Sequence, residues 1–360
     1  MAQRAIFRRV VKDLVPIEAC RRALVIKLRH HGDVLLASPV LSVLKSANPS
    51  LEVDALVYDD TAPMLEGHPA LSQLHAVGRK WRDEAFASRF SKEKALFGKL
   101  KERQYDLIVH LSEQPRGAWL ARTLGARYSV APRMADRGGF WHKSFTHLYP
   151  MARRRHQVEV NLDALRRIGI QPAPDNRRVT FVPGEAAERR IAELVPQPYV
   201  HMHPASRWKF KCWPVEKNAE LVDRLATHGL PVVLTAAPDP SEMQMVRAIE
   251  EKAAAKTLNL AGQLSIGELG ALAARAELFV GVDSMPMHLA AAMGTRTVAL
   301  FGPSGEAEWG PWNVPHRIVS TTHSCRPCGF DGCGGGKVSD CLVRLPVDAA
   351  YEAARELLQN

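Results

Sequence analysis

A glycine and an aspartate that directly follow an apolar run form the first combination able to do chemistry. Gly32 and Asp33 come after the apolar residues 23–28. Glycine permits a tight turn there, and the N–H groups that begin the next helix attract anions. Asp33 could take a proton from a hydroxyl group, or it could cap the helix, the commoner role for aspartate at this position. We interpret the adjacent His30 and His31 as polar loop residues.

A basic loop with two tryptophans, residues 203–214, is the second candidate. Arg207, Lys209 and Lys211 stand close together in it, interleaved with Trp208 and Trp213. Lysine is a movable point charge and arginine a rigid fork, so such a loop suits a diphosphate. The alternative is a solvated loop whose tryptophans pack into the core.

The third candidate is the segment from Asp283 to His288. Asp283 or Ser284 can cap a helix whose first turn accepts Pro286 and which ends at Gly294. The N-terminus of that helix would attract a phosphate. His288, among apolar neighbours, lies near the bound group or is an ordinary buried histidine.

Four cysteines in the spacing C-x2-C-x4-C-x7-C form a fourth cluster: Cys325, Cys328, Cys333 and Cys341. Four thiolates in a glycine-rich loop can hold a tetrahedral zinc ion, so we predict a structural zinc site. Free thiols in an ordinary loop, or transient disulfides, are the alternatives. No catalytic partner for a cysteine nucleophile is evident.

Two familiar nucleotide motifs fail. No strand is followed by G-x-G-x-x-G, which argues against a dinucleotide-binding dehydrogenase. The segment 332–337 is one residue too short for a phosphate loop, and Val338 stands where a hydroxyl is needed.

The elements that must position these residues alternate between strands and helices, which predicts an α/β fold with parallel sheets. We expect two such halves facing a central cleft, because ligands bind beyond the carboxyl ends of parallel strands. The predicted strands are residues 23–28, 51–57, 105–111, 199–202, 230–234, 278–281 and 297–301. The predicted helices are a stretch beginning near residue 34, and residues 91–103, 215–228, 241–255, 266–274, 286–293 and 347–358.

The predicted organisation has four parts. A basic extension (1–21) precedes a first domain (22–176) and a second domain (177–345) that includes the Cys-rich loop 323–341; a C-terminal helix (346–360) closes the chain. Within residues 1–22 an apolar stripe, Ile6, Val10 and Leu14, runs beside several arginines. That pattern suits a helix lying on anionic lipid or one covering the first domain.

Composition narrows the class of protein. The chain has 360 residues, 46% hydrophobic and 24% charged, with a net charge of +10, which excludes wholesale disorder and favours an anionic partner. We expect no signal peptide and no spanning helix, and therefore a cytoplasmic location. Dispersed basic residues without a recognition motif argue against nucleic acid.

Three segments in order, residues 24–34, 211–214 and 282–289, resemble the ADP-heptose:lipopolysaccharide heptosyltransferases, glycosyltransferase family 9. The similarity runs from about residue 22 to the end. Residues 27–33 and the Cys-rich tail are most similar to the heptosyltransferase III branch. The resemblance implies a GT-B fold, transfer of heptose with inversion, and no catalytic metal.

The resemblance also implies roles by position. Asp33 matches the general base, and Lys211 matches the lysine that binds the donor diphosphate. Asp283 matches the carboxylate that positions the heptose, and Glu242, or less favourably Asp239, falls where a ribose is held. The remaining donor contacts implied are Ser206, Arg207, Ser284 and His288.

The acceptor implied is the lipopolysaccharide inner core at the inner face of the cytoplasmic membrane. Arg116, Arg133 and Arg137 lie after the predicted strand 105–111 and could meet this anionic glycolipid, or they are simply solvated. The membrane surface itself is then an expected partner. The rival functions are another lipopolysaccharide heptosyltransferase or nucleotide-sugar glycosyltransferase of the same fold, and a non-catalytic protein that binds a nucleotide or the core oligosaccharide.

Overall fold

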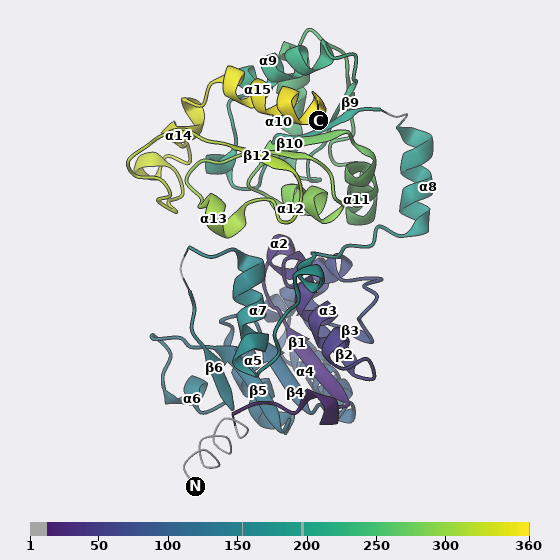
Figure 1. The fold of residues 1–360 in the computed structure, drawn as a ribbon, viewed down its shortest axis with the longest axis vertical. Coiled ribbons are helices and arrows are strands. Elements are labelled where there is room, and N and C mark those ends of the chain that lie inside the picture. Colours follow the sequence, from purple (N-terminus) through teal and green to yellow (C-terminus); the bar gives the residue numbers. More distant parts are fainter. Residues whose placement is uncertain (1–12, 153, 196–197, 360) are drawn as a thin grey trace. The chain divides into compact units, whose positions relative to one another are not determined.

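The computed structural model describes residues 13–152, 154–195 and 198–359, and its chain divides into two compact units, Met1–Thr180 and Phe181–Asn360. Each unit contains a six-stranded sheet in which every pairing is parallel (Figure 1). The α/β prediction with two parallel sheets is therefore confirmed.

The first sheet has the strand order β3-β2-β1-β4-β5-β6. This is the Rossmann order, in which the chain starts in the middle, runs to one edge and then returns past its starting strand. The central strands are buried on both faces, which explains their continuous apolar runs. The strands are β1 Arg22–Ile26, β2 Glu52–Tyr58, β3 Gln73–Val77, β4 Leu107–His110, β5 Tyr128–Pro132 and β6 His147–Tyr149.

Helices connect these strands. The helical stretch predicted after Asp33 is divided, because Leu36 and Ala37 separate α2 from α3. Pro39 stands in the first turn of α3, where its missing N–H costs nothing. The helices are α2 His31–Leu35, α3 Ser38–Ala47, α4 Phe86–Glu102, α5 Pro115–Thr123, α6 Gly139–His142 and α7 Gln157–Arg167. The 3-10 turns are η1 Ile17–Ala19, η2 Asp59–Met64, η3 Arg79–Asp83 and η4 Pro174–Arg177.

The N-terminal extension is described only from Asp13 onward. Val15 donates to the Ile168 carbonyl, and the Asn48 side chain binds the carbonyls of Ile17 and Cys20, so this stretch packs against the first unit. The lipid-binding or covering helix expected in residues 1–22 falls mainly on residues 1–12, which lie outside the described residues.

The second sheet repeats the Rossmann order as β12-β11-β10-β7-β8-β9. Its strands are β7 Val200–His203, β8 Val232–Leu234, β9 Thr257–Asn259, β10 Leu278–Val282, β11 Thr297–Leu300 and β12 His316–Val319. Its helices are α8 Glu185–Leu194, α9 Val215–Ala226, α10 Pro240–Lys252, α11 Ile266–Arg275, α12 Met285–Ala292, α13 Glu306–Trp309, α14 Asp340–Val343 and α15 Val347–Gln359, with 3-10 turns η5 Lys209–Lys211 and η6 Cys333–Gly335.

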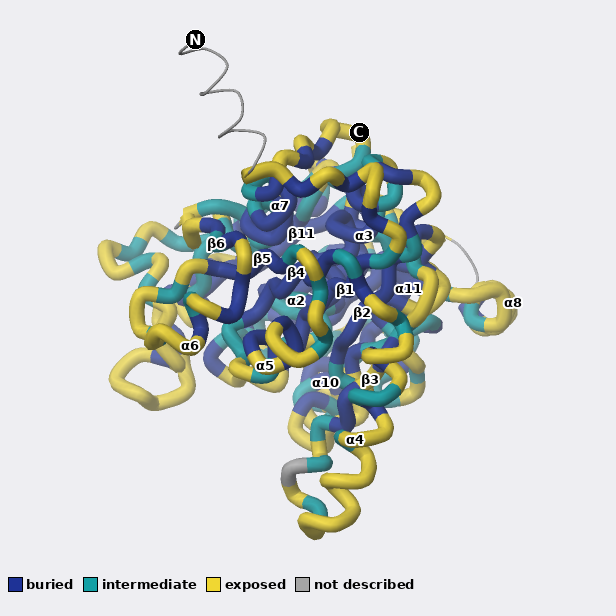
Figure 2. Tube along the Cα trace, turned by 90° about the horizontal axis from the view of Figure 1, so that it is seen from below, coloured by how far each residue is buried: buried dark blue, intermediate teal, exposed yellow. Residues whose placement is uncertain are grey.

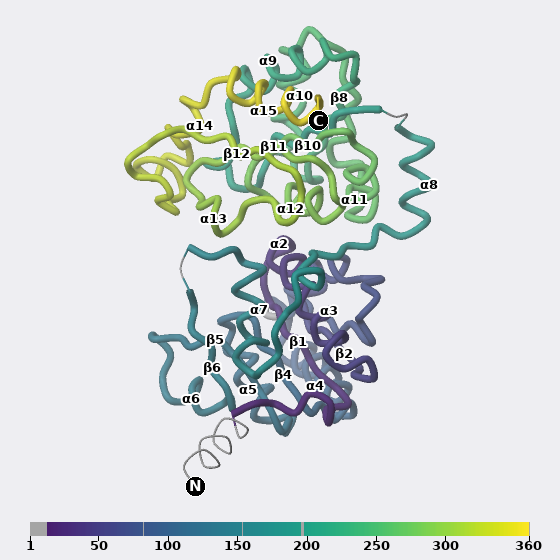
Figure 3. The backbone as a smooth tube through the Cα atoms, viewed as in Figure 1, coloured from purple at the N-terminus to yellow at the C-terminus, as the bar shows by residue number. Residues whose placement is uncertain are grey.

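The helix α15, predicted at residues 347–358, is built into the core of the second unit (Figure 3). It packs against α9 and against strands β10, β11 and β12. Ala350, Ala354 and Leu357 are buried in the same cluster as β7 and β10. The helix α15 is therefore part of the hydrophobic core of the second unit.

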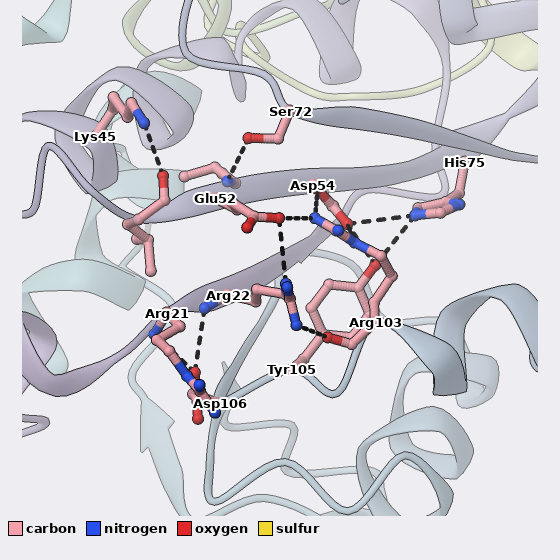
Figure 4. A network of polar contacts seen from close by, with 12 residues as sticks. Arg21, Arg22, Lys45, Glu52, Asp54, Ser72, His75, Arg103, Tyr105 and Asp106 are labelled. Atoms are coloured by element: carbon pink, nitrogen blue, oxygen red, sulfur yellow. Dashed lines mark hydrogen bonds and ion pairs between the residues drawn. The ribbon is translucent and has the colours of Figure 1, made fainter.

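A polar network fixes the amino ends of the strands in the first sheet (Figure 4). Asp54 on β2 is fully buried and accepts hydrogen bonds from Arg103 and from the Tyr105 hydroxyl at 2.7 and 2.8 Å. His75 lies 3.1 Å from that hydroxyl. Burial alone would raise the pKa of Asp54, but hydrogen bonds from His75, Arg103 and Tyr105 hold it below its ordinary value.

Candidate functional site

The topology places a candidate site in the second unit at the point where the strand order reverses, between β7 and β10. Ligands of such sheets bind in the crevice beyond the carboxyl ends of the strands flanking that point. The loop after β7 begins at Pro204 and contains Lys211, and the loop after β10 begins at Asp283. Two of the three segments singled out in the sequence therefore meet here.

An ion pair joins the two loops. Lys211 Nζ donates to Asp283 Oδ2 at 2.6 Å, and the Asp283 side chain is only 6% exposed against 22% for Lys211. The loop is braced behind the lysine, because Phe210 is buried and its carbonyl accepts from Ser339 Oγ at 2.7 Å. A buried carboxylate thus lies beside a partly exposed ammonium group. The ammonium group has three N–H donors, and Asp283 Oδ2 accepts only one of them, so Lys211 can also donate to a ligand.

The helix α12 begins directly beside this pair. Ser284 occupies its N-cap position and Pro286 stands in its first turn, as predicted. Neither Asp283 nor the Ser284 side chain caps the helix, because the Ser284 hydroxyl donates to the Val282 carbonyl instead. The first N–H groups of an eight-residue helix point away from the helix body and carry partial positive charge, which favours a phosphate. His288 is buried, with its ring 6.3 Å from that of Trp309.

The remaining predicted donor residues of the second unit lie on the β7 loop and on α10. Ser206 is buried and its Oγ accepts from the Trp208 N–H, while the Arg207 guanidinium stacks on the Trp208 ring at 4.7 Å. Glu242 on α10 is buried, and its Oε2 accepts from the Ala237 N–H at 3.1 Å. Burial raises the pKa of Glu242, and the nearby Arg207 opposes that rise.

Asp239 has a different role from Glu242. Its Oδ1 accepts from the N–H groups of Ser241 and Glu242, at 2.9 and 3.2 Å, and so caps α10. The carboxylate of Asp239 is therefore engaged in capping the start of α10, which favours Glu242 over Asp239 for any ligand contact.

Sequence reasoning missed a buried trio beneath the β7 loop. Nδ1 of His203 and Nε2 of His201 each lie 2.8 Å from the Thr235 hydroxyl. Burial lowers the pKa of His203 to about 3, so its ring is neutral. The three residues lock the carboxyl end of β7 to β8, and only the alternation of histidines on β7 hinted at them.

In the first unit the strand order reverses between β1 and β4, and Asp33 follows β1. Asp33 is not the N-cap of α2, a position held by His30, so the capping alternative is wrong. The carboxylate lies in the first helical turn, 11% exposed, with its Oδ1 3.5 Å from Arg29 Nε. It is thus a nearly buried carboxylate with one arginine partner at the edge where a ligand is expected.

A lysine to which the sequence analysis gave no role interacts electrostatically with Asp33. Lys27 is buried, and its Nζ donates to the Leu111 carbonyl at 2.9 Å and to Asn161 Oδ1 at 3.0 Å. Burial lowers the pKa of Lys27 to about 8, and the carboxylate of Asp33 opposes that shift. Lys27 therefore ties together the loops after β1 and β4 and adds positive charge under the candidate base.

The three arginines predicted for the acceptor all follow carboxyl ends of strands in the first sheet. Arg116, in the first turn of α5, pairs with Glu93 at 2.6 Å. Arg137 donates to the Glu113 carbonyl at 3.3 Å, and Arg133 directly follows β5 and is exposed. Arg116 is therefore partly neutralised, which leaves Arg133 the more accessible cation.

The predicted zinc site is not formed. In the part of the chain that the structure describes, no group of three or more His, Cys, Asp or Glu side chains is arranged to hold a metal ion. Cys325 and Cys333 are exposed, whereas Cys341 is buried in α14 and burial raises the pKa of its thiol. The four cysteines, Cys325, Cys328, Cys333 and Cys341, are free thiols here.

The order of the Cys-rich loop comes from an arginine instead. Arg326 is 8% exposed in its side chain and donates to the carbonyls of Gly302 and Thr321, at 2.6 and 3.1 Å. It also pairs with Glu306 at 3.1 Å. A buried guanidinium group that donates to several acceptors therefore orders this loop, the role predicted for a zinc ion.

A cavity of about 490 Å³ lies elsewhere in the first unit, beside the Asp54 network. Its lining residues are Gln73, Leu74, His75, Lys99, Glu102 and Arg103. They come from the start and middle of β3 and the end of α4, and so lie away from the carboxyl ends of the strands. This position indicates that the cavity is a feature of the Asp54 network and not the main ligand site.

Solved structures of glycosyltransferases share the fold of this chain. The glycosyltransferase family 9 protein from Veillonella parvula aligns with a TM-score of 0.81 at 20% identity, over 96% of this chain and 99% of that one. An E. coli heptosyltransferase crystallised with ADP-2-deoxy-2-fluoro heptose aligns with a TM-score of 0.72 at 21% identity, over 93% and 99%. The fold is the GT-B fold of these glycosyltransferases.

Sequence comparison narrows the class to a family. The profile of glycosyltransferase family 9 (heptosyltransferase) matches residues 94–338. Lipopolysaccharide heptosyltransferase 3 of Escherichia coli is 37% identical over 294 residues, which cover 79% of this chain and 85% of that protein. The chain belongs to glycosyltransferase family 9, the heptosyltransferases.

Proposed function

We propose that this enzyme moves heptose from ADP-heptose to the heptose region of the lipopolysaccharide inner core, with inversion and without a catalytic metal. The identity to lipopolysaccharide heptosyltransferase 3 supports this substrate pair. The observation that carries the proposal is the Lys211–Asp283 pair, which sets a group for a diphosphate beside a group for sugar hydroxyls at the start of α12.

Asp33 acts as the general base in this proposal. Its carboxylate accepts the proton of the acceptor hydroxyl while that oxygen attacks the anomeric carbon of the heptose. The bond from the anomeric carbon to the diphosphate oxygen breaks, and its electron pair leaves with ADP. Because the attack comes from the face opposite the leaving group, the configuration at that carbon inverts.

The second unit binds the donor. Lys211 and the first N–H groups of α12 offset the negative charge that grows on departing ADP. Asp283 accepts hydrogen bonds from heptose hydroxyls, and Ser206, Arg207, Ser284 and His288 surround the phosphates. Glu242 accepts from the ribose hydroxyls, while Arg116, Arg133 and Arg137 face the anionic acceptor.

We further propose that the enzyme works from the cytoplasm at the inner face of the membrane, where its lipid-bound acceptor lies. No helix among the described residues has the length and apolar character to cross a bilayer. Contact with the membrane would therefore be peripheral in this proposal.

Purified protein offered ADP-heptose and a set of truncated lipopolysaccharide cores tests the function directly, with mass spectrometry of the products. One added heptose on a heptose-bearing core supports the proposal. Transfer from a different nucleotide sugar would point to another glycosyltransferase activity. Tight binding of both substrates without any product would instead support a non-catalytic binding protein.

A further inference from the structure

The first half of α4 lies outside the core of its unit. From Phe86 to Ala95 no described side chain is buried, and Leu96 and Leu100 are the buried residues of this helix. Figure 2 shows this part of α4 as exposed. Only the second half of the helix therefore packs on the sheet, and the first half projects beyond it.

The projecting half carries large aromatic side chains. Phe86 and Phe90 are 81% and 59% exposed and stack on one another, with ring centroids 6.1 Å apart. Helical spacing sets both on the same stripe as Phe97, which contacts Trp119 of α5 at 5.2 Å. The apolar stripe that faces the core farther along α4 thus continues past the core.

The aromatic surface extends over the two neighbouring helices. Trp119 on α5 and Phe140 on α6 are also exposed, and Arg122 of α5 stacks on the Phe140 ring at 4.9 Å. We call Phe86, Phe90, Trp119 and Phe140 the aromatic face. Exposed aromatic side chains on contacting helices, α4 with α5 and α5 with α6, indicate an interaction site.

The charge around the aromatic face is positive. Helix α4 contains five lysines and arginines against two glutamates, a net charge of +3. Lys92 pairs with Glu84, and Glu93 pairs with Arg116. Arg89 and Lys94 are exposed and have no carboxylate partner among the described residues. Aromatic side chains beside exposed cations are the pattern of a helix that lies in an anionic lipid interface.

The position of the projecting half matches such a role. Helix α4 follows β3 and η3, so its N-terminal half stands at the carboxyl edge of the first sheet. Asp33 and Arg116 follow β1 and β4 at the same edge. A lipid surface held there would bring a lipid-bound acceptor to the edge that carries the candidate base.

We propose that the aromatic face, with Arg89 and Lys94, docks the enzyme on a bilayer containing anionic phospholipid. The assignment to a membrane-bound acceptor rests on the proposed function, but the docking itself does not. Charge complementarity favours a bilayer over a second copy of this chain, because two copies would bring the same positive helix together. Phe86 and Phe90 enter the headgroup region, and Arg89 and Lys94 bind lipid phosphates.

Co-sedimentation of the full chain with vesicles tests the docking without any activity. We expect binding to phosphatidylcholine vesicles with about a quarter phosphatidylglycerol, weak binding to pure phosphatidylcholine, and release in high salt. The double variant F86S/F90S should lower the partition coefficient about tenfold or more, and R89E/K94E should lower it for anionic vesicles alone. F330S, which removes a 71% exposed aromatic from the second unit, is the matched control and should bind normally.

Two further arms can overturn the proposal. R8E/R9E in the full chain changes the basic N-terminal extension; if it abolishes binding while F86S/F90S leaves it intact, the extension is the anchor. Light scattering that shows F86S/F90S breaking a dimer, with unchanged vesicle binding, would assign the aromatic face to a second copy. F86S/F90S should transfer heptose to a lipid-free core oligosaccharide as fast as the wild type, because that acceptor needs no membrane. If the wild type itself fails in this lipid-free reaction, the proposed function is wrong, and the docking proposal is untouched.

Discussion

A lysine and an aspartate occur together at the topological switch point of both units, but they are used differently. In the first unit Lys27 is buried and donates hydrogen bonds to the Leu111 carbonyl and to Asn161, while Asp33 pairs with Arg29. In the second unit Lys211 is partly exposed and binds Asp283 directly. The difference suggests that the first lysine supports the site and the second one serves a ligand.

The largest effect that tests this comparison should come from Asp33. We expect D33N to lower the rate of heptose transfer about 10²–10⁴-fold, because the amide cannot accept the acceptor proton. ADP binding and the free energy of unfolding should change little, because Asp33 caps no helix. Steady-state kinetics and calorimetry measure these quantities, with D175N on the exposed surface as the control.

A D33N enzyme that keeps its turnover would contradict the role that the comparison gives to Asp33 in the first unit. It would mean that Asp33 only balances Arg29 and Lys27, and that another group accepts the proton.

The second test separates the two members of the pair in the second unit. K211A should weaken ADP and ADP-heptose binding alike, by about tenfold or more, since both ligands carry the diphosphate. D283A should weaken ADP-heptose binding more than ADP binding, because only the former carries the sugar. Isothermal titration with K256A as the exposed-lysine control measures both.

Equal losses for both ligands in D283A would remove its sugar-binding role. The carboxylate would then act only by positioning Lys211.

The third test sharpens the supporting role of Lys27 through pH. Its pKa of about 8 in the folded protein lies below the ordinary value near 10.4, so the unfolded chain holds more protons between these values. The free energy of unfolding of the wild type should therefore rise relative to K27M from pH 8 to pH 10, by about 2 kcal/mol. Urea unfolding at both pH values measures the difference.

Arg326 provides a matched comparison in the second unit, because it too is a buried cation that binds backbone carbonyls. R326M should cost about 1–3 kcal/mol of unfolding free energy for each carbonyl left without a donor. It should show no extra pH dependence between pH 8 and 10, since a guanidinium group stays charged there. If the free energy of unfolding of R326M depends on pH as strongly as that of K27M, the pH dependence does not come from deprotonation of Lys27.

The smallest effect concerns metal. Because Arg326 orders the Cys-rich loop, a chelator should leave the melting temperature unchanged, and elemental analysis should find well under one zinc per chain. One tightly held zinc, with a lower melting temperature after chelation, would show that the four cysteines rearrange around a metal.

The sequence predicted what depends on local pattern. The apolar runs that became β1 and β10 were identified because strands buried on both faces are continuously hydrophobic. The strand β2 was identified from the alternation of its residues. The edge strands β3, β6, β9 and β12 were missed, since short or half-exposed strands at sheet edges lack that run. The inner strand β5 was missed too, because its five residues include Ser129 and Pro132 and form no continuous apolar run. The start of α12 was predicted because proline and a small polar residue mark it clearly.

Long-range pairings could not be predicted in the same way. Lys211 and Asp283 were each singled out, but their direct contact spans 72 positions. Lys27 was not singled out at all, because its burial depends on Leu111 and Asn161, which lie 84 and 134 positions away. A buried lysine has no local sequence signal, since lysine is ordinarily a surface residue.

The place of α15 in the second core has a consequence for how the protein is made. The first unit has all its strands by Tyr149 and its core helix α7 by Arg167, so it can fold while the rest is still being translated. The second unit cannot, because Ala350, Ala354 and Leu357 fill its core and Leu345 accepts from the Trp213 indole. Until α15 leaves the ribosome, the second unit exposes apolar surface, and chaperones have their longest opportunity to bind this half of the chain.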